Sequence, residues 1–274
     1  QRLGLVGKPA IQNAAISACA EGVQWQVALC LLIEARITQV GVDNITYNAS
    51  IAACGKGHAW QAAVALHAEM SGLKLIPEAI TASALISACS YAAEWRRALH
   101  IFDDFQSSSC SLSISSYSNA LTACGQGHFW ERAMQLIADA RSGGVAMDAR
   151  TYDAALSTFI LAGREDLAVR YCEDALKDDS YKLWKAPGVL DLHHRPVEVA
   201  KLAVKVALVK RASQNEDLTI VVGKGIHSEG GEGIVRHQVL DLLQKELGIE
   251  DADFLASNMG RIHLQRESLQ KMFA

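Results

Sequence analysis

The sequence predicts an α-solenoid of two-helix repeats followed by a small α/β sandwich domain. The first observation is that several residue types recur along the first two thirds of the chain at a step of 35 residues. The second is that this period stops at Trp184, after which strand and helix patterns alternate. A fixed period of this length is typical of repeat proteins, in which each unit buries its apolar face against its neighbours. We therefore divide the chain into a repeat array, 1–183, and a terminal domain, 184–274.

The period is carried by four columns of residues. Tryptophan, cysteine, alanine and an acidic side chain each return to the same place in successive units. The members are Trp25, Trp60, Trp95 and Trp130; Cys19, Cys54, Cys89 and Cys124; Ala28, Ala63, Ala98, Ala133 and Ala168; and Glu34, Glu69, Asp104, Asp139 and Asp174. They define the units 9–43, 44–78, 79–113, 114–148 and 149–183. We expect the tryptophans to fill the space between a helix pair and its neighbour rather than to stack on bases.

Each unit carries the pattern of two helices joined by a tight turn. In unit 44–78, small and apolar residues over 49–54 form the buried face of a first helix. The glycines of 55–58 permit the turn, and a second helix is predicted from Trp60 to Met70. A lone helix pair cannot bury its apolar stripe, so the pairs are expected to stack.

The fifth unit keeps the register but loses the residues that mark the others. Phe159 occupies the cysteine slot, Ala162 the glycine slot and Glu165 the tryptophan slot. Solenoids need a terminal unit with a polar outer face. Unit 149–183 is therefore predicted to be a cap.

After a short linker at 185–188 the pattern changes to alternating strands and helices. The predicted strands and helices are 189–192, a helix that starts at Pro196, 218–222, 234–247 and short extended segments around Phe254 and over 261–264. Gly248 is predicted to end the second of these helices. Strands that alternate with helices indicate a compact α/β domain.

Composition limits the function classes. Half of the 274 residues are hydrophobic and one fifth are charged, which is typical of a globular chain. The net charge of -4 argues against strong nonspecific binding of nucleic acid, but a local basic or hydrogen-bonding groove stays open. Equivalent cysteines lie roughly 10 Å apart in stacked helices, too far for a disulfide, whose Cα atoms lie within about 7 Å. They are predicted to be apolar core residues in a reducing compartment.

The units share further polar residues. The start of a unit reads Thr-Tyr-Asn at 46–48, Ser-Tyr-Ser at 116–118 and Thr-Tyr-Asp at 151–153, and two units end in Asp43 and Asp148. With the period of 35 residues, these motifs make residues 1–183 similar to the pentatricopeptide repeat family, in which two or three side chains of each repeat read one RNA base. The resemblance implies single-stranded RNA as the partner.

In that family the fifth residue of a unit and its last residue read the base. The resemblance therefore nominates four pairs: Asn13 with Asp43, Asn48 with Glu78, Ser83 with Ser113, and Ser118 with Asp148. The resemblance implies that the first pair reads uracil and the fourth reads guanine, and it leaves the bases of the middle two pairs open. It also implies that Asp153 with Leu183 reads no base.

Elementary chemistry supports the same residues and also offers an alternative. A short amide or hydroxyl can donate to and accept from a base edge, and a carboxylate beside it can orient it. Asparagine and serine also cap the first turn of a helix, which would give these columns a purely structural role. Both interpretations stay open.

In the terminal domain, Asp191 and His193 belong to the stretch Leu-Asp-Leu-His. On a strand the two would share one face, and the leucines the other. A carboxylate beside an imidazole suits metal binding or general acid–base catalysis, whereas a solvated strand face explains the pair equally well.

A glycine-rich loop comes after the strand at 218–222. Gly223, Lys224 and Gly225 could aim backbone N–H groups and an ammonium at a phosphate, although a plain turn is the alternative and the Walker spacing is absent. Residues 186–274 resemble the small MutS-related (Smr) domain. They depart from it at two places: Val222 stands where threonine is usual, and residues 194–196 replace the usual glycine-containing turn.

Members of the Smr family bind nucleic acid and several cut it. The resemblance implies that His193 acts as general base or acid, and that Asp191 orients it or holds a divalent ion such as Mg²⁺. Lys224 and the glycine amides would stabilise charge on the phosphate. His227 is a second candidate proton donor.

These residues lead to three candidate functions. The first is an RNA-processing endonuclease of the PPR-SMR family, the second a non-enzymatic RNA-binding factor that stabilises or remodels transcripts, and the third a protein scaffold. The family suggests a chloroplast or mitochondrion. Because the chain begins at Gln1 inside a repeat, we expect a targeting segment and further repeats to precede it.

Overall fold

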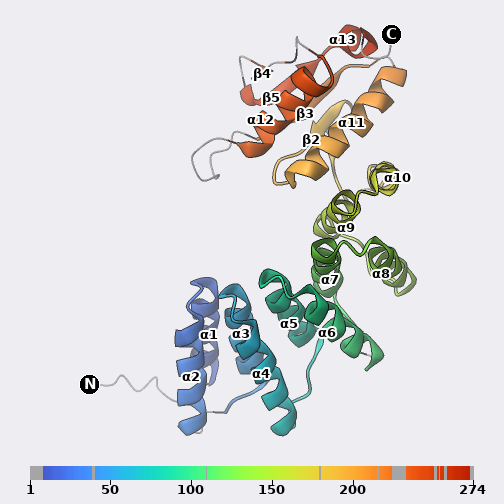
Figure 1. Ribbon diagram of the computed structural model, residues 1–274. Helices are drawn as coiled ribbons and strands as arrows, with labels where there is room; N and C mark the ends of the chain where they lie inside the picture. Colours follow the sequence, from blue (N-terminus) through green and yellow to red (C-terminus); the bar gives the residue numbers. More distant parts are fainter. Residues whose placement is uncertain are drawn as a thin grey trace. The chain divides into compact units, whose positions relative to one another are not determined.

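The computed structural model describes residues 9–38, 41–108, 110–178, 180–214, 216–223, 233–249, 252, 254–255 and 258–271 (Figure 1). By compactness the chain divides into two units, Gln1–Ala146 and Met147–Ala274. No helix in these described ranges is both long and apolar enough to cross a bilayer.

The first unit consists of helix pairs at the predicted period. The helices are α1 (Pro9–Glu21), α2 (Trp25–Ile37), α3 (Asn44–Lys56), α4 (Trp60–Gly72), α5 (Ala79–Tyr91), α6 (Trp95–Ser107), α7 (Ile114–Gly127) and α8 (Trp130–Ser142). The first helices of successive pairs stack on one another, α1 on α3, α3 on α5 and α5 on α7. The helix pairs of the predicted solenoid are thus confirmed.

The alanine and cysteine columns form the interior of these pairs. Ala28, Ala63, Ala98 and Ala133 are fully buried, as are the thiols of Cys54, Cys89 and Cys124. Burial raises the pKa of the Cys54 thiol to about 11 and that of Cys124 to about 12. All seven cysteines are free, and Cys19 is only partly covered. The predicted role of this column as apolar core is confirmed for its three buried members.

Trp25, Trp60 and Trp95 lie against the following helix pair, as predicted. All four tryptophans of the column are half-buried, because each stands at the start of a second helix, close to an interhelical turn. A Cβ added to Gly57 would lie 2.1 Å from Trp25 Cδ1, and one added to Gly127 would lie 3.0 Å from the Trp95 ring. These rings therefore pack on the turn of the following pair, at the edge of the core rather than inside it.

The second unit begins with one more helix pair, α9 (Ala149–Leu161) and α10 (Glu165–Ala175). The α/β domain then comprises β1 (Trp184–Ala186), β2 (Val189–Asp191), α11 (Val197–Gln214), β3 (Leu218–Val221), α12 (Ile234–Asp241), the π-helical turn η1 (Leu242–Glu246), β4 (Phe254–Leu255), β5 (Asn258–Leu264) and α13 (Arg266–Lys271). Both α9 and α10 contact α11, so the fifth pair shares the compact unit of the α/β domain. Compactness thus divides the chain before the fifth pair, whereas the change from helix pairs to strands falls at Trp184.

The described strands form one sheet in the order β1-β2-β3-β5-β4. Strands β2 and β3 are parallel and joined through α11, and the other neighbours are antiparallel. Leu190, Ile220 and Ile262 point to one face and are fully buried, where α11 packs against β3. The predicted strands and helices are present, and Gly248 has the left-handed backbone expected of a residue that ends a helix, with φ +69°.

Candidate nucleic-acid interface

The first predicted pair comes together at the start of α3. Asp43 caps this helix, because its Oδ1 accepts from the Thr46 backbone N–H at 2.9 Å. Asn13 Nδ2 donates to the same oxygen at 3.4 Å, and the Thr46 hydroxyl lies 2.7 Å from Asn13 Oδ1. Burial acts to raise the pKa of Asp43, but the hydrogen bonds from Thr46 and Asn13 outweigh it and lower the pKa below its usual value. The amide and the carboxylate are thus held in one hydrogen-bonded group.

The second pair repeats this geometry in part. The Thr81 hydroxyl donates to Asn48 Oδ1 at 2.7 Å and accepts from the Glu78 backbone N–H at 3.0 Å. Asn48 is 8% exposed, and its Nδ2 has no hydrogen-bond partner among the described residues. The side chain of Glu78 is exposed. Asn48 is therefore tied through Thr81 to the backbone of Glu78, and no hydrogen bond from its amide to the Glu78 carboxylate is present among the described residues.

The third and fourth pairs are less closely tied. Ser113 caps α7 and Asp148 caps α9, the latter through the Thr151 N–H at 2.8 Å. Ser83 is half-buried, and no contact between its hydroxyl and Ser113 is present among the described hydrogen bonds. Ser118 is only 3% exposed. Ser118 and Asp148 belong to different compact units.

The fifth residues and the last residues of the units differ in whether they cap a helix. The fifth residues of the units lie inside their helices and do not cap them, whereas the last residues, Asp43, Ser113 and Asp148, do cap the next helix. The structural alternative considered for asparagine and serine applies to the last residue of a unit, not to the fifth. The nominated reading roles themselves stay predictions.

The third residue of each unit had no predicted role. In the second to fifth units this column holds hydroxyls, Thr46, Thr81, Ser116 and Thr151, whereas the first unit has Ile11. All four residues are buried, and the first two join a fifth residue to the following cap. The signal in the sequence was the recurrence of Thr or Ser at the same step of 35 residues.

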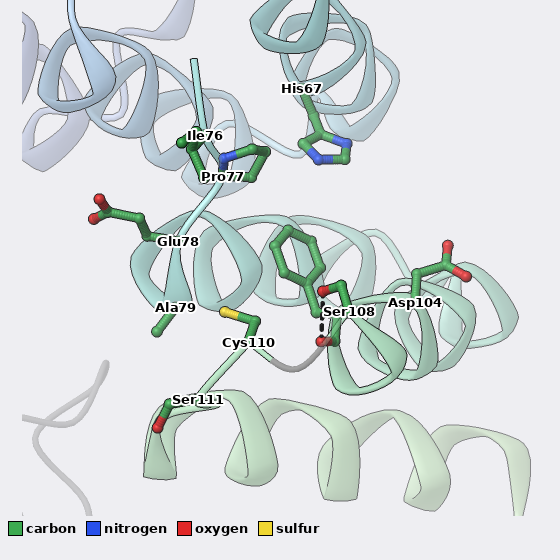
Figure 2. A pocket seen from close by; sticks show the side chains of 10 residues that line it. His67, Ile76, Pro77, Glu78, Ala79, Asp104, Ser108, Cys110 and Ser111 are labelled. Atoms are coloured by element: carbon green, nitrogen blue, oxygen red, sulfur yellow. Dashed lines mark hydrogen bonds between the residues drawn. The ribbon is translucent and has the colours of Figure 1, made fainter. Parts of the chain in front are cut away.

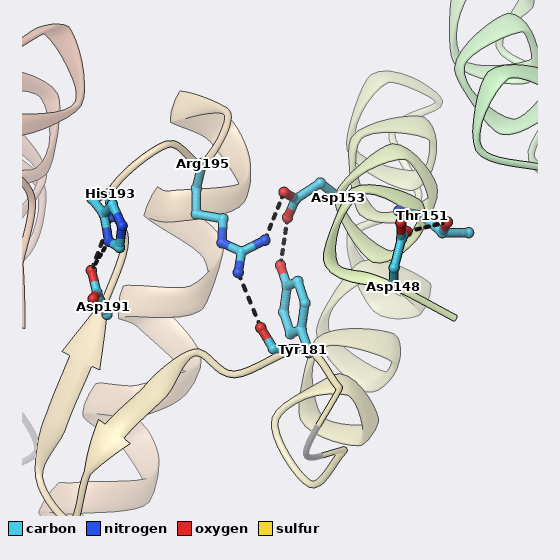
Figure 3. Close-up of polar contacts among 7 residues, drawn as sticks. All are labelled: Asp148, Thr151, Asp153, Tyr181, Asp191, His193 and Arg195. Atoms are coloured by element: carbon cyan, nitrogen blue, oxygen red, sulfur yellow. Dashed lines mark hydrogen bonds and ion pairs between the residues drawn. The ribbon is translucent and has the colours of Figure 1, made fainter. Parts of the chain in front are cut away.

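A different network surrounds the fifth residue of the fifth unit (Figure 3). Asp153 accepts from the Tyr181 hydroxyl at 2.7 Å and from Arg195 Nη1 at 2.9 Å. Arg195 Nη2 donates to the Tyr181 carbonyl at 3.0 Å, and its guanidinium lies 4.6 Å from the centre of the Tyr181 ring. Burial and then the Asp153 charge raise the pKa of Tyr181, so its hydroxyl remains a donor. Asp153 is thereby fully engaged within the protein.

The Asp191–His193 pair lies at the end of β2 (Figure 3). The Oδ1 atom of Asp191 is hydrogen-bonded to His193 Nδ1 and also accepts from the His193 backbone N–H at 3.3 Å. Asp191 is 9% exposed, whereas the His193 side chain is 53% exposed. The buried carboxylate thus orients an imidazole whose other nitrogen faces outward. The predicted proximity of the two side chains is confirmed, and their chemical roles stay predictions.

The predicted phosphate loop is described only at its first residue. Gly223 has φ +78°, a conformation that favours glycine, and a Cβ there would lie 3.6 Å from His193 Cβ. The loop therefore starts beside the Asp191–His193 pair. Lys224, Gly225 and His227 lie outside the described residues.

The metal prediction can be compared with the donors around Asp191. Within the described part of the chain, no group of three histidine, cysteine or acidic side chains is placed to hold a metal ion. Asp191 is a single carboxylate, and its Oδ1 is already bonded to His193. These residues alone do not build a metal site, and we derive no chemical step through a metal.

A recess that was not expected from the sequence lies in the first unit, beside Glu78 (Figure 2). It has a volume of about 630 Å³ and is lined by residues of α4, α6 and the connecting segments, among them His67, Pro77, Glu78, Phe105 and Cys110. The His67 ring contacts Phe105, with 5.6 Å between ring centres, and burial lowers the pKa of His67 although Asp104 opposes the shift. The charged side chains of this recess are thus the carboxylates of Glu78 and Asp104, beside a mostly apolar wall.

No family model matches the chain, and no curated protein matches it either. Among solved structures, the chain is similar to the pentatricopeptide repeat protein PPR10 from maize, with 20% identity over 78% of this chain and 29% of that one at a TM-score of 0.53. It is also similar to PPR10 in complex with an 18-nt psaJ RNA element, with 20% identity over 87% of this chain and 31% of that one at a TM-score of 0.56.

A third similar structure is the PPR domain of Arabidopsis thaliana protein-only RNase P 1 in complex with tRNA, at 16% identity and a TM-score of 0.53 over 63% of this chain and 92% of that one. The chain spans about three tenths of the length of PPR10. At these identities the likeness concerns the fold alone. The chain thus has the fold of a pentatricopeptide repeat solenoid, followed by a small α/β domain.

Proposed function

We propose that this chain binds single-stranded RNA through the fifth and last residues of its repeats. The observation that carries the proposal is the recurring group in which a buried hydroxyl holds an asparagine beside the next cap, Thr46 for Asn13 and Thr81 for Asn48. A fixed amide beside a carboxylate can present donors and acceptors to a base edge without first losing rotamer entropy. Support comes also from the similar folds that were solved with RNA, PPR10 with its RNA element and the RNase P domain with tRNA.

The test uses RNA preference rather than affinity alone. The first pair, Asn13 with Asp43, predicts uracil, and the fourth pair, Ser118 with Asp148, predicts guanine. The test RNA carries these two bases, and the two bases between them are randomised. Asn13→Ser should shift the preference at the first position and leave the other three unchanged. Gln12→Ala, at a residue that bonds the Leu31 carbonyl at 2.7 Å, is the matched control within the same helix. Equal preference in both variants would contradict base reading by Asn13.

For the α/β domain we propose nucleic-acid processing, with cleavage as the more specific form. His193 has the buried carboxylate partner and the outward nitrogen that a general base needs. In cleavage, its free ring nitrogen would take the proton from the attacking hydroxyl while Asp191 stabilises the imidazolium formed. The proposal extends the resemblance of residues 186–274 to Smr domains, and Lys224, Gly225 and His227 would serve the phosphate and the leaving oxygen.

A cleavage assay separates this from the alternative, a non-enzymatic factor that stabilises or remodels transcripts. Wild type and the Asp191→Ala/His193→Ala variant would be compared on one matched RNA, with and without Mg²⁺, which also tests the proposed divalent metal. Loss of cutting in the variant with retained RNA binding is expected. Equal cutting by both proteins would reject these residues, and no cutting by wild type would favour the alternative. Targets in a chloroplast or mitochondrion are proposed on the same resemblance.

A further inference from the structure

The sheet of the α/β domain has two unlike faces. On one face Leu190, Ile220 and Ile262 are fully buried, and α11 packs on that side. The pairing register places Asp191 opposite Val221 and Val221 opposite Arg261, and it places Thr219 opposite His263. Because side chains alternate along a strand, these residues share the other face.

This second face is polar and half-open. Val221, Arg261, Thr219 and His263 are all partly exposed. The Thr219 hydroxyl lies 3.0 Å from His263 Nδ1, so the two side chains meet on this face. The other ring nitrogen of His263 has no hydrogen-bond partner among the described residues. The His263 side chain is thus held by Thr219 through one ring nitrogen and is partly exposed.

The charged side chains that β2, β3 and β5 place on this face are Arg261 and Asp191. Asp191 is the one acidic residue of β2, β3 and β5, and it is bonded to His193. Arg261 has no carboxylate within ion-pair distance in the described part of the chain. Such a guanidinium beside an imidazole suits a phosphate, which an arginine can bind through two parallel hydrogen bonds.

The same register brings this face close to the His193 loop. Asp191 and Arg261 lie in one row on strands separated by β3 alone, so their backbones are roughly 10 Å apart at the usual strand spacing of about 4.8 Å. One RNA strand that reaches His193 can therefore also touch Arg261. Resting on the proposed binding of RNA, we propose that Arg261 and His263 form a backbone-binding surface for single-stranded RNA on the open face of the sheet.

The test measures RNA affinity of the full chain over a range of salt concentrations. The RNA is the matched sequence with flanking nucleotides on both sides. Arg261→Gln should weaken binding by about fivefold and reduce the slope of log K against log salt by about 0.7, the contribution of one phosphate contact on a single strand. Arg261→Lys should retain the slope, because it keeps the charge.

Arg266→Gln is the matched control, since Arg266 is an exposed arginine of the same domain that lies near Glu267 on α13. It should leave the affinity and the slope unchanged. Crosslinks from the RNA to the β5 peptide of wild type would support the surface independently of any variant. If wild type binds the RNA and Arg261→Gln has the same affinity and salt dependence as Arg266→Gln, the proposed backbone-binding surface is wrong. RNA binding by the repeats would be unaffected by that result. If wild type binds no RNA, the proposed function itself fails.

Discussion

The fifth residue of a repeat unit has two different surroundings in this protein. Asn48, in a middle unit, accepts from the Thr81 hydroxyl of the next unit and keeps its amide N–H free of partners among the described residues. Asp153, in the last unit, is held by Tyr181 and by Arg195, which belong to the segment after its helix pair. The helix position is the same, so the difference comes from the neighbouring element, another helix pair for Asn48 and the α/β domain for Asp153. On the proposed binding of RNA, only the first kind of neighbour leaves a fifth residue able to meet a base.

The largest expected effect comes from breaking the Asp153–Arg195 pair. Both side chains are mostly buried, at 12% and 13% exposure, so Arg195→Ala leaves an uncompensated carboxylate and should cost about 3 kcal/mol of local stability. Native-state hydrogen exchange of the α9 and α11 amides would record this as faster exchange. Arg266→Ala, at an exposed arginine of the same unit, should change these amides little.

The double variant Asp153→Ala/Arg195→Ala sharpens this result. Removing both partners also removes the uncompensated charge, so it should be less destabilising than the sum of the single changes. Additive costs would show that the two side chains do not interact, and the distinction between the fifth pair and the others would then lose its basis.

A smaller effect is expected from the hydroxyl column. Thr81→Val keeps the shape of the side chain but removes the partner of Asn48 Oδ1 and of the Glu78 N–H, which should cost about 1–2 kcal/mol. Exchange of the first-turn amides of α5 would measure this cost. The preference that wild type selects from the randomised base opposite Asn48 should weaken as well. Thr122→Val is the control, because that hydroxyl bonds the Ser118 carbonyl of its own helix.

The smallest effect concerns pH and the Asp43 cap. Replacing Asp43 by Ala should cost about 1 kcal/mol at neutral pH, the usual value of a helix cap. The hydrogen bonds from Thr46 and Asn13 lower the pKa of Asp43 in the folded state, so its contribution is complete above the ordinary aspartate pKa of 3.8 and is lost as the pH falls through the lower folded value. The stability difference between wild type and Asp43→Ala should therefore shrink below about pH 4. A difference independent of pH down to acid unfolding would contradict a role for the ionised carboxylate.

Much of the candidate site could be predicted from local patterns. The proximity of Asp191 and His193 was predicted from the alternation of residues along a strand. In the structure β2 ends at Asp191, and His193 lies in the turn after it, where its ring and its backbone N–H both reach Asp191 Oδ1. The burial of the cysteine column was predicted from its position on the first helices. The tryptophans were predicted to fill the space between a helix pair and its neighbour, and Trp25 and Trp95 do so. The sequence did not indicate that they would do so at the turns that contain Gly57 and Gly127, where the rings are only half-buried.

By itself, the sequence determined the period, the helix pairs and the residues that share a slot, because each of these depends on spacing within about one unit. Tertiary structure alone decided which slots touch. The Thr46 hydroxyl meets Asn13 across 33 positions, and Arg195 meets Asp153 across 42. Such contacts depend on how consecutive pairs stack and on where the α/β domain rests on the fifth pair, and neither is encoded in the local alternation of apolar and polar residues.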